Sequence, residues 1–169
     1  MAIPKSILNY LDKNKIKYEI LKHRIVYTAY DKAATLAVKP VQVAKTVIVN
    51  LDKKDHALGL IPANKNLDKK KLLALINKQR QKTKLPNFKK IDFAQEQWMK
   101  RALPGIKVGA TPAFGIIYKL PTFMDNALTG QPKLIVNAGD YQNSLKITPA
   151  ALFKLDKNIV KGSFIQAKK

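Results

Sequence analysis

The chain of 169 residues and 19.0 kDa has the size of one domain, and its hydrophobic share of 46% suffices for a buried core, which excludes a disordered basic tail. It contains no cysteine, so disulfides, cysteine-ligated zinc and thiol nucleophiles are excluded together. Lysine and arginine number 32 against 11 acidic residues, and the net charge of +21 favours a polyanionic partner, either nucleic acid or an anionic membrane surface.

The N-terminal segment predicts two short helices. The first is expected to begin near Pro4, a residue suited to a first helical turn, and to fade by residues 13–15. A short strand is expected at 18–20. Thr28 and Asp31 have the spacing of a capping box, and the helix that they open should end before Pro40.

The middle of the chain predicts a hairpin and a basic helix. Residues 43–51 are rich in β-branched side chains and lead through a polar turn into a second apolar segment at 57–61. Residues 68–78 predict a lysine-rich helix capped by Asp68 or Asn66.

After residue 91 the pattern becomes short strands broken by proline and glycine, closed by a helix at 149–157 with Thr148 as its cap. The sum is an α+β fold, in which a mixed, barrel-like β-sheet is surrounded by helices. One domain is expected over residues 1–169. Neither a signal peptide nor an apolar run long enough for a membrane span is evident, so a cytoplasmic protein without membrane association is expected.

Positive charge is concentrated in residues 65–90, which carry ten Lys/Arg and the single acid Asp68. Only three of the 32 cations are arginine, so contact with a phosphate backbone is favoured over reading of bases. The candidate RNA-binding residues are Lys69, Lys70, Lys71, Lys78, Arg80, Lys82 and Lys84.

Lys45 interrupts an otherwise apolar row of alternate residues in the strand 43–51. A buried ammonium is costly unless an anion or a hydrogen-bond acceptor meets it, which makes Lys45 a candidate for binding an anionic ligand. The alternative is that Lys45 lies at the start of the strand and extends into solvent along its own stem.

Two further segments are candidates for a pocket wall. The loop 108–115 is bounded by glycines, which allow close approach of backbone to a ligand, although a plain turn is the alternative. Residues 137–139 break a predicted strand in a similar way. His23 and His56 lack any metal-binding or catalytic spacing, so no metal and no cofactor are expected.

Seven short segments, taken in order, resemble the YbaK/EbsC family, the free-standing relatives of the editing domain inserted in bacterial prolyl-tRNA synthetases. The resemblance extends from about residue 5 to residue 157. The segments are 27–29, 43–49, 61–63, 67–72, 109–115, 120–128 and 137–139.

This resemblance implies an aminoacyl-tRNA hydrolase that acts in trans on mischarged tRNA, such as alanyl- or cysteinyl-tRNA(Pro). It assigns the key role to Lys45, and the tRNA acceptor end becomes the partner of the basic residues above. The pocket residues that it implies are Gly109, Ala110, Thr111, Pro112, Ala113, Phe114, Gly115, Asn137 and Gly139.

Alternatives remain at this stage. A non-catalytic, basic tRNA- or RNA-binding module on the same scaffold would also explain the charge. Membrane association ranks last, because no helix pairs a basic face with large aromatic residues. The sequence leaves open whether the chain is a monomer or a weak homodimer, and whether it docks on an aminoacyl-tRNA synthetase.

Overall fold

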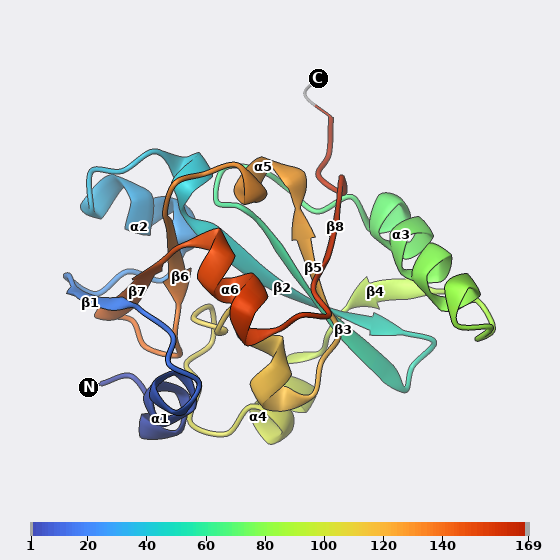
Figure 1. The fold of residues 1–169 in the computed structure, drawn as a ribbon, viewed down its shortest axis with the longest axis horizontal. Helices are drawn as coiled ribbons and strands as arrows, with labels where there is room; N and C mark the ends of the chain where they lie inside the picture. Colours follow the sequence, from blue (N-terminus) through green and yellow to red (C-terminus); the bar gives the residue numbers. More distant parts are fainter. Residues whose placement is uncertain (1, 168–169) are drawn as a thin grey trace.

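A long β-hairpin forms the centre of the fold, in a computed structural model that describes residues 2–167. Its strands are β2 (Ala44–Leu51) and β3 (Asp55–Pro62), which pair antiparallel from Ala44–Pro62 to Leu51–Asp55. The turn between them places Asp52 and Lys53 at positive φ. Figure 1 shows the hairpin crossing the middle of the molecule. The predicted hairpin is therefore confirmed.

The strands form two sheets, and β2 connects them. The five-stranded sheet has the order β4-β2-β3-β5-β8, with β5 parallel to both β3 and β8, and the three-stranded sheet has the order β1-β7-β6. A parallel bridge between Val43 and Ile135 joins the start of β2 to β6. The remaining strands are β1 (Glu19–Lys22), β4 (Ile91–Phe93), β5 (Thr122–Asp125), β6 (Leu134–Asn137), β7 (Asn143–Ile147) and β8 (Val160–Gly162).

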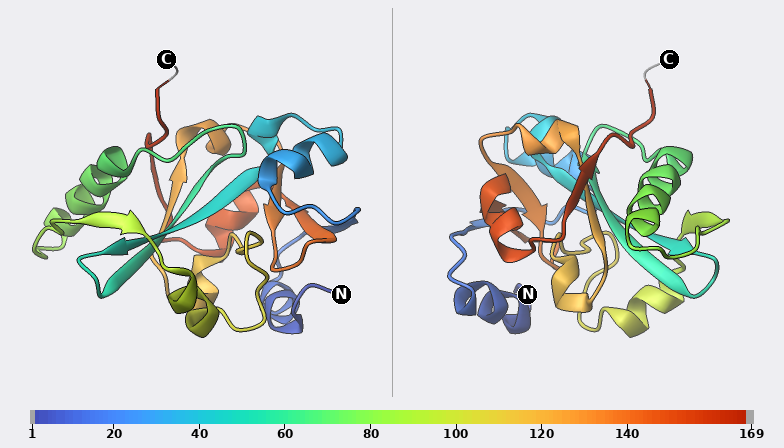
Figure 2. Two further views of the ribbon diagram at one scale, coloured as in Figure 1. Left: turned by 180° about the vertical axis from the view of Figure 1, so that it is seen from behind. Right: turned by 45° about the vertical axis from the view of Figure 1, so that its right-hand side comes forward.

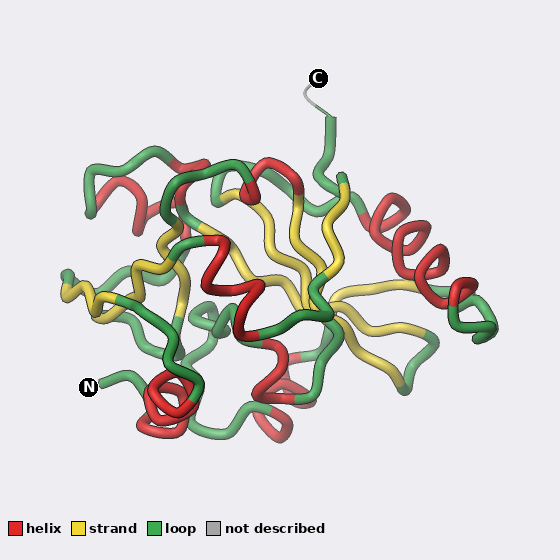
Figure 3. Tube along the Cα trace, viewed as in Figure 1, coloured by secondary structure: helices red, strands yellow, loops and turns green. Residues whose placement is uncertain are grey.

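Helices surround these sheets, as the views in Figures 2 and 3 show. They are α1 (Lys5–Lys13), α2 (Ala29–Thr35), α3 (Lys69–Lys82), α4 (Glu96–Ala102), α5 (Asn126–Thr129) and α6 (Pro149–Leu155), with 3₁₀ turns at Pro40–Gln42 and Gly115–Tyr118. The predicted α+β class, with mixed β structure inside and helices outside, is confirmed. Within the described residues, none of the helices combines the length and the apolar character needed to span a membrane.

Two apolar clusters hold the elements together on opposite sides of β2. The larger cluster includes Ile7 of α1 and Ile48 of β2, and the second packs Leu72 and Ile76 of α3 against Val49. Because side chains alternate along a strand, neighbouring residues of β2 contribute to different clusters. This arrangement buries both faces of the strand that carries Lys45.

Several predicted boundaries hold and others shift. Asp68 caps α3 by accepting a hydrogen bond from the Lys71 backbone N–H, and Thr148 caps α6 in the same way. Helix α3 runs four residues beyond the predicted end at 78. Helix α2 begins after the Thr28 cap but already ends at Thr35, so Pro40 instead begins a 3₁₀ turn. Helix α4 was not predicted.

Candidate functional site

A cavity of about 320 Å³ opens beside β2, at the place where the strand passes from one sheet to the other. Strand β4 pairs only with Val49–Leu51, and the bridge to β6 is at Val43, so residues 45–47 lie between these two pairings. The start of α2, the β4–α4 connection, the loop at 109–111 and the end of β6 complete the wall. The cavity therefore draws its residues from five separate parts of the chain.

Lys45 lines this cavity and is half-buried. Its Nζ donates a hydrogen bond of 2.7 Å to the backbone carbonyl oxygen of Lys65. The ammonium therefore has a neutral hydrogen-bond acceptor rather than a carboxylate as its partner. Burial lowers the pKa of the Lys45 ammonium from its ordinary value. The two ion pairs found among residues 2–167 involve other lysines, so the charge of Lys45 is available to an anionic ligand.

Thr46 also lines this cavity. Its Oγ1 is buried and, among the buried side-chain nitrogen and oxygen atoms of the described part of the chain, is the one without a hydrogen-bond partner. Leaving such a group unpaired costs roughly 1–3 kcal/mol. The C=O of Ile48 accepts from the Ala94 N–H, and alternation along the strand turns the N–H of Thr46 to the same edge. Thr46 thus offers two polar groups at this edge.

Asn137, at the end of β6, is 5% exposed and also lines the cavity. Its Oδ1 accepts a hydrogen bond from Nζ of Lys32, a lysine of α2 that is only 3% exposed. Because a lysine ammonium can only donate, this contact assigns the oxygen of the Asn137 amide to Lys32 and leaves the Nδ2 group for the cavity.

Lys32 is buried on the side of Asn137 away from the cavity, where Asp140 provides the compensating charge. Burial lowers the pKa of the Lys32 ammonium to about 8, and the negative charge of Asp140 opposes that shift. Asp140 in turn accepts a 2.7 Å hydrogen bond from Asn143 Nδ2. A buried polar network therefore holds the Asn137 amide in one orientation.

Backbone geometry fixes the mouth of the cavity. Gly109 has φ +85°, and a Cβ at this position would lie 2.8 Å from the carbonyl oxygen of Tyr27. The Tyr27 ring is 64% exposed and packs edge-to-face on Tyr141, with ring centroids 4.8 Å apart. An exposed, oriented aromatic ring at the mouth is suited to stacking on a nucleotide base.

The structure brings Lys45, Gly109, Thr111 and Asn137 together at the cavity, and it places the other pocket candidates elsewhere. Ala113 and Phe114 are buried in the larger apolar cluster, and Ala110 and Pro112 are buried in the same loop. A Cβ on Gly115 would meet Thr122, and one on Gly139 would meet Ile106. These residues support the cavity wall through contacts with the protein interior and do not line the cavity.

The seven basic candidates of residues 69–84 point in several directions. Lys69 pairs with Asp92, Lys71 donates to the carbonyl oxygen of Ile165, and the Arg80 guanidinium stacks on Phe88 at 3.8 Å. Lys70, Lys78, Lys82 and Lys84 are exposed. The run therefore does not form a single basic face.

Sequence reasoning missed three residues, of which Thr46 and Tyr27 line the cavity and Lys32 contacts the cavity residue Asn137. Lys32 lies among alanines in a predicted helix, a pattern that gives no indication of burial, and its partner Asn137 is 105 positions away. Thr46 follows Lys45 directly in the predicted strand 43–51, but its hydroxyl was not singled out. Tyr27 belongs to one of the seven segments that resemble the family, but the sequence alone does not reveal how exposed its side chain is.

The histidines lie outside this cavity. His23 accepts or donates at Ser144 Oγ over 2.8 Å, and His56 stacks on Trp98 with ring centroids 3.5 Å apart. No group of three or more His, Cys, Asp or Glu side chains within residues 2–167 could hold a metal ion.

Fold and cavity together define an α+β domain with a lysine-bearing cavity at the junction of two sheets. The sequence profile of the aminoacyl-tRNA editing domain family matches residues 23–155, which include every cavity residue described above. The protein belongs to this family, and the resemblance to YbaK/EbsC proteins is confirmed.

Solved structures share the fold over nearly the whole chain. The hypothetical protein APE2540 superimposes with a TM-score of 0.77 at 17% identity, covering 95% of this chain and 99% of that one. A candidate trans-editing enzyme for prolyl-tRNA synthetase gives 0.76 at 19% identity, covering 96% of each chain. A candidate signal transduction protein from Marinobacter aquaeolei VT8 gives 0.69 at 14% identity, covering 98% of this chain and 31% of that one. A comparison with curated proteins finds no match.

Proposed function

We propose that this protein hydrolyses the ester that joins a wrong amino acid to the 3′ end of tRNA, with alanyl- or cysteinyl-tRNA(Pro) as the model substrates. The observation that carries the proposal is the meeting of three polar groups at one cavity: the Lys45 ammonium, the unpartnered Thr46 hydroxyl and the Asn137 amide. Membership of the editing family supports the same reaction class.

Each group has a role that its chemistry suits. The Lys45 ammonium would pair with a phosphate near the terminal nucleotide and so position the ester. The Tyr27 ring would stack on the terminal base. The Thr46 hydroxyl, the Thr46 N–H and the Asn137 Nδ2 group are donors that can stabilise negative charge developing on the ester carbonyl oxygen.

The reaction needs no nucleophilic side chain, because an aminoacyl ester is already activated. A water oxygen bonds to the carbonyl carbon, and the carbonyl oxygen becomes an oxyanion. The bond from that carbon to the ribose oxygen then breaks, and a proton from the water passes to the departing ribose oxygen. The products are the free amino acid and tRNA with its 3′-terminal hydroxyl restored. A tRNA substrate would place the protein in the cytoplasm.

The test is hydrolysis of a panel of mischarged tRNAs, beginning with alanyl- and cysteinyl-tRNA(Pro), by the wild type and two variants. Lys45→Ala should reduce the rate at least about 100-fold, the size of effect that misplacement of the substrate produces. Full activity of Lys45→Ala with a wild-type circular dichroism spectrum would refute the proposal.

Thr46→Val provides a second arm that separates activity from folding. Because the Thr46 hydroxyl lacks a partner within the described chain, its loss should leave the free energy of unfolding equal or higher. Hydrolysis should nevertheless slow. An unchanged rate would remove Thr46 from the proposed site while leaving Lys45 to be judged on its own variant.

A second candidate function is a non-catalytic RNA-binding module, favoured by a separate basic groove beside the cavity. It would show tRNA binding that weakens with salt, but no hydrolysis of any member of the panel. Turnover of one substrate above the uncatalysed rate excludes it.

A further inference from the structure

A groove of about 710 Å³ lies next to the Lys45 cavity, between α3 and α4. In the left view of Figure 2, strand β4 and the tip of the β2–β3 hairpin lie between these two helices. Five cations from four segments line it, with one acid among them. The cations are Lys53, Lys70, Lys89, Lys90 and Arg101, and the acid is Asp92.

The groove is positively charged because its five cations outnumber its single acid, Asp92. The Asp92 carboxylate also already has partners outside the five cations. Asp92 pairs with Lys69 at 3.4 Å and accepts the Phe93 backbone N–H at 2.9 Å. These contacts, the Phe93 N–H first and the Lys69 ammonium second, lower the pKa of the Asp92 carboxyl. Neither ion pair formed within residues 2–167 uses any of the five groove cations.

Hydrogen bonds hold the backbone of three of these lysines in place. The Asp52 carboxylate accepts the backbone N–H groups of Lys89 and Lys90, with a shortest distance of 2.7 Å. Asn50 bonds both the N–H and the carbonyl oxygen of Lys53. The hairpin turn and the segment before β4 are thereby tied together, and their lysine side chains stay exposed.

Aromatic rings lie among the cations. His56 and Trp98 stack nearly parallel in the wall of the groove, and Phe93 is 52% exposed. Fixed cations interleaved with exposed rings match a strand of nucleic acid, whose phosphates seek charge and whose bases seek flat apolar faces. A lipid surface would instead require an apolar face that inserts as one patch.

The groove and the cavity share a wall. Phe93 lines both, and β2 contributes Lys45 to the cavity and Asn50 to the groove. Five residues of strand span about 17 Å, so a chain that ends at Lys45 reaches the groove within a few nucleotides.

We propose that this groove, rather than the outer face of α3, binds the RNA strand leading to the aminoacylated 3′ end, with Phe93 at the junction as a base-stacking platform. The direction of the RNA strand in the groove rests on the proposed function, because that function places the 3′ end in the cavity. It gives the RNA a single path of approach.

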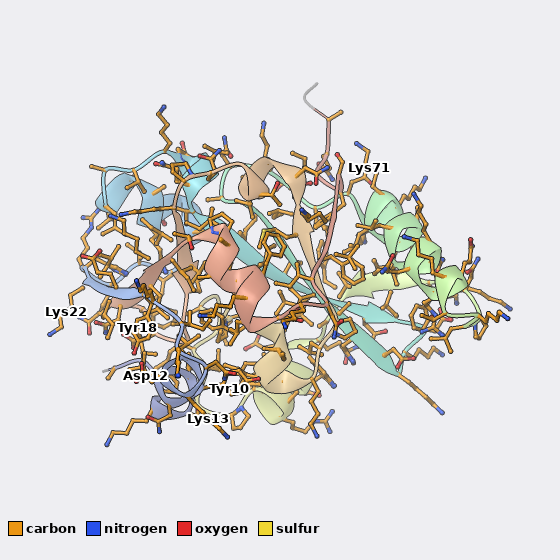
Figure 4. The ribbon with its side chains drawn as sticks, viewed as in Figure 1. Tyr10, Asp12, Lys13, Tyr18, Lys22 and Lys71 are labelled. Carbon is orange, nitrogen blue, oxygen red and sulfur yellow. The ribbon has the colours of Figure 1, made fainter. Side chains whose placement is uncertain are left out.

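The test measures binding of uncharged tRNA, so that no catalysis is needed. Lys89→Glu/Lys90→Glu is compared with Lys13→Glu/Lys22→Glu, which removes the same charge on exposed residues at the far end of the molecule (Figure 4). The groove pair should raise Kd at least about tenfold and reduce the slope of log K against log salt by about 2, since each lost phosphate contact accounts for about 1. The control pair should shift Kd several-fold less.

Further comparisons test which surface of the protein binds the RNA. Lys78→Glu/Lys82→Glu tests the outer face of α3, and a loss there equal to or above that of the groove pair would overturn the proposal. Equal losses from the control pair would also overturn it, because they would indicate attraction to net charge alone. Unchanged tRNA binding by the groove pair, together with lost adsorption to phosphatidylserine-rich vesicles, would assign the groove to a membrane instead.

The proposal and the proposed function fail in different ways. In one outcome, the wild type binds tRNA through Lys89 and Lys90 yet hydrolyses no mischarged tRNA. That result would refute the proposed deacylase function and support the proposed RNA-binding groove. Hydrolysis that depends on Lys45 with binding indifferent to the groove would do the reverse. Phe93→Ala should raise KM for hydrolysis with little change in kcat, and an unchanged KM would remove Phe93 from the path.

Discussion

Lys32 illustrates how a buried residue can set the chemistry of a neighbouring cavity. Its ammonium occupies the oxygen of the Asn137 amide and so determines which end of that amide faces a ligand. A neutral side chain of similar length would leave the amide free to rotate. The cost is a buried charge in the folded protein, and that cost depends on pH.

We predict that Lys32 makes folding stability rise with pH relative to Lys32→Met. Its pKa is about 8 when folded against 10.5 for an unperturbed lysine, so between these values the unfolded chain binds the extra proton. Stability must then increase with pH, by up to about 3 kcal/mol for a shift of this size. Below pH 8 both states are protonated and the difference between the two proteins should be constant.

Urea unfolding at several pH values from 7 to 10 measures this difference. Lys13→Met is the matched control for the loss of one lysine, because Lys13 is exposed. A gap for Lys32→Met that stays flat across the range would contradict the pKa assignment.

At the scale of elements, the site depends on how β2 is shared. The strand pairs with β4 at one end and meets β6 at the other, and the interval between the pairings becomes the cavity edge. The loop around Gly109 closes the opposite side by approaching the backbone at Tyr27. Both features are contacts between segments rather than properties of one segment.

We predict that Gly109→Ala impairs both stability and hydrolysis. The substitution adds strain at positive φ, which destabilises by more than about 1 kcal/mol, and its Cβ would push the Tyr27 carbonyl away. Gly105→Ala is the matched control, because Gly105 has φ +80° but no atom within 4 Å of the added Cβ. It should lose stability while keeping kcat, and equal rates for the two variants would argue against a role for the Tyr27 contact.

At the scale of the whole molecule, the net charge of +21 opposes folding. Only two ion pairs form among residues 2–167, and the labelled lysines in Figure 4 point outward. Like charges spread over a small surface repel one another, and salt screens them over about 10 Å at 0.1 M. Charge that favours RNA binding therefore reduces stability.

We predict that sodium chloride raises Tm while weakening tRNA binding. Screening worth about 1 kcal/mol would raise Tm by roughly 2–4 °C for a domain of this size. Calorimetry from 20 to 300 mM salt measures the effect, and Lys13→Glu/Lys22→Glu, whose net charge is lower by four, should show a smaller rise. A Tm that is independent of salt would contradict the self-repulsion argument.

Features that depend on neighbouring residues could be predicted from the sequence alone. The hairpin at 44–62, the Asp68 and Thr148 caps and the anomaly of Lys45 in an apolar strand all follow from patterns a few residues long. The resemblance placed these pieces in one family. Helix α4 could not be predicted because it is only seven residues long and its Gln95 cap makes no side-chain hydrogen bond.

The surroundings of Lys45 became known from the folded structure and could not be predicted from the sequence. The Lys65 carbonyl, the Lys32–Asn137 contact and the groove that shares Phe93 with the cavity join segments far apart in the chain. Residues of the loop 109–115 that seemed equivalent in sequence were separated into wall and core by packing. The physical reason is that local patterns report backbone preference and burial, whereas a site is formed by distant side chains whose contacts exist only once the sheets are joined.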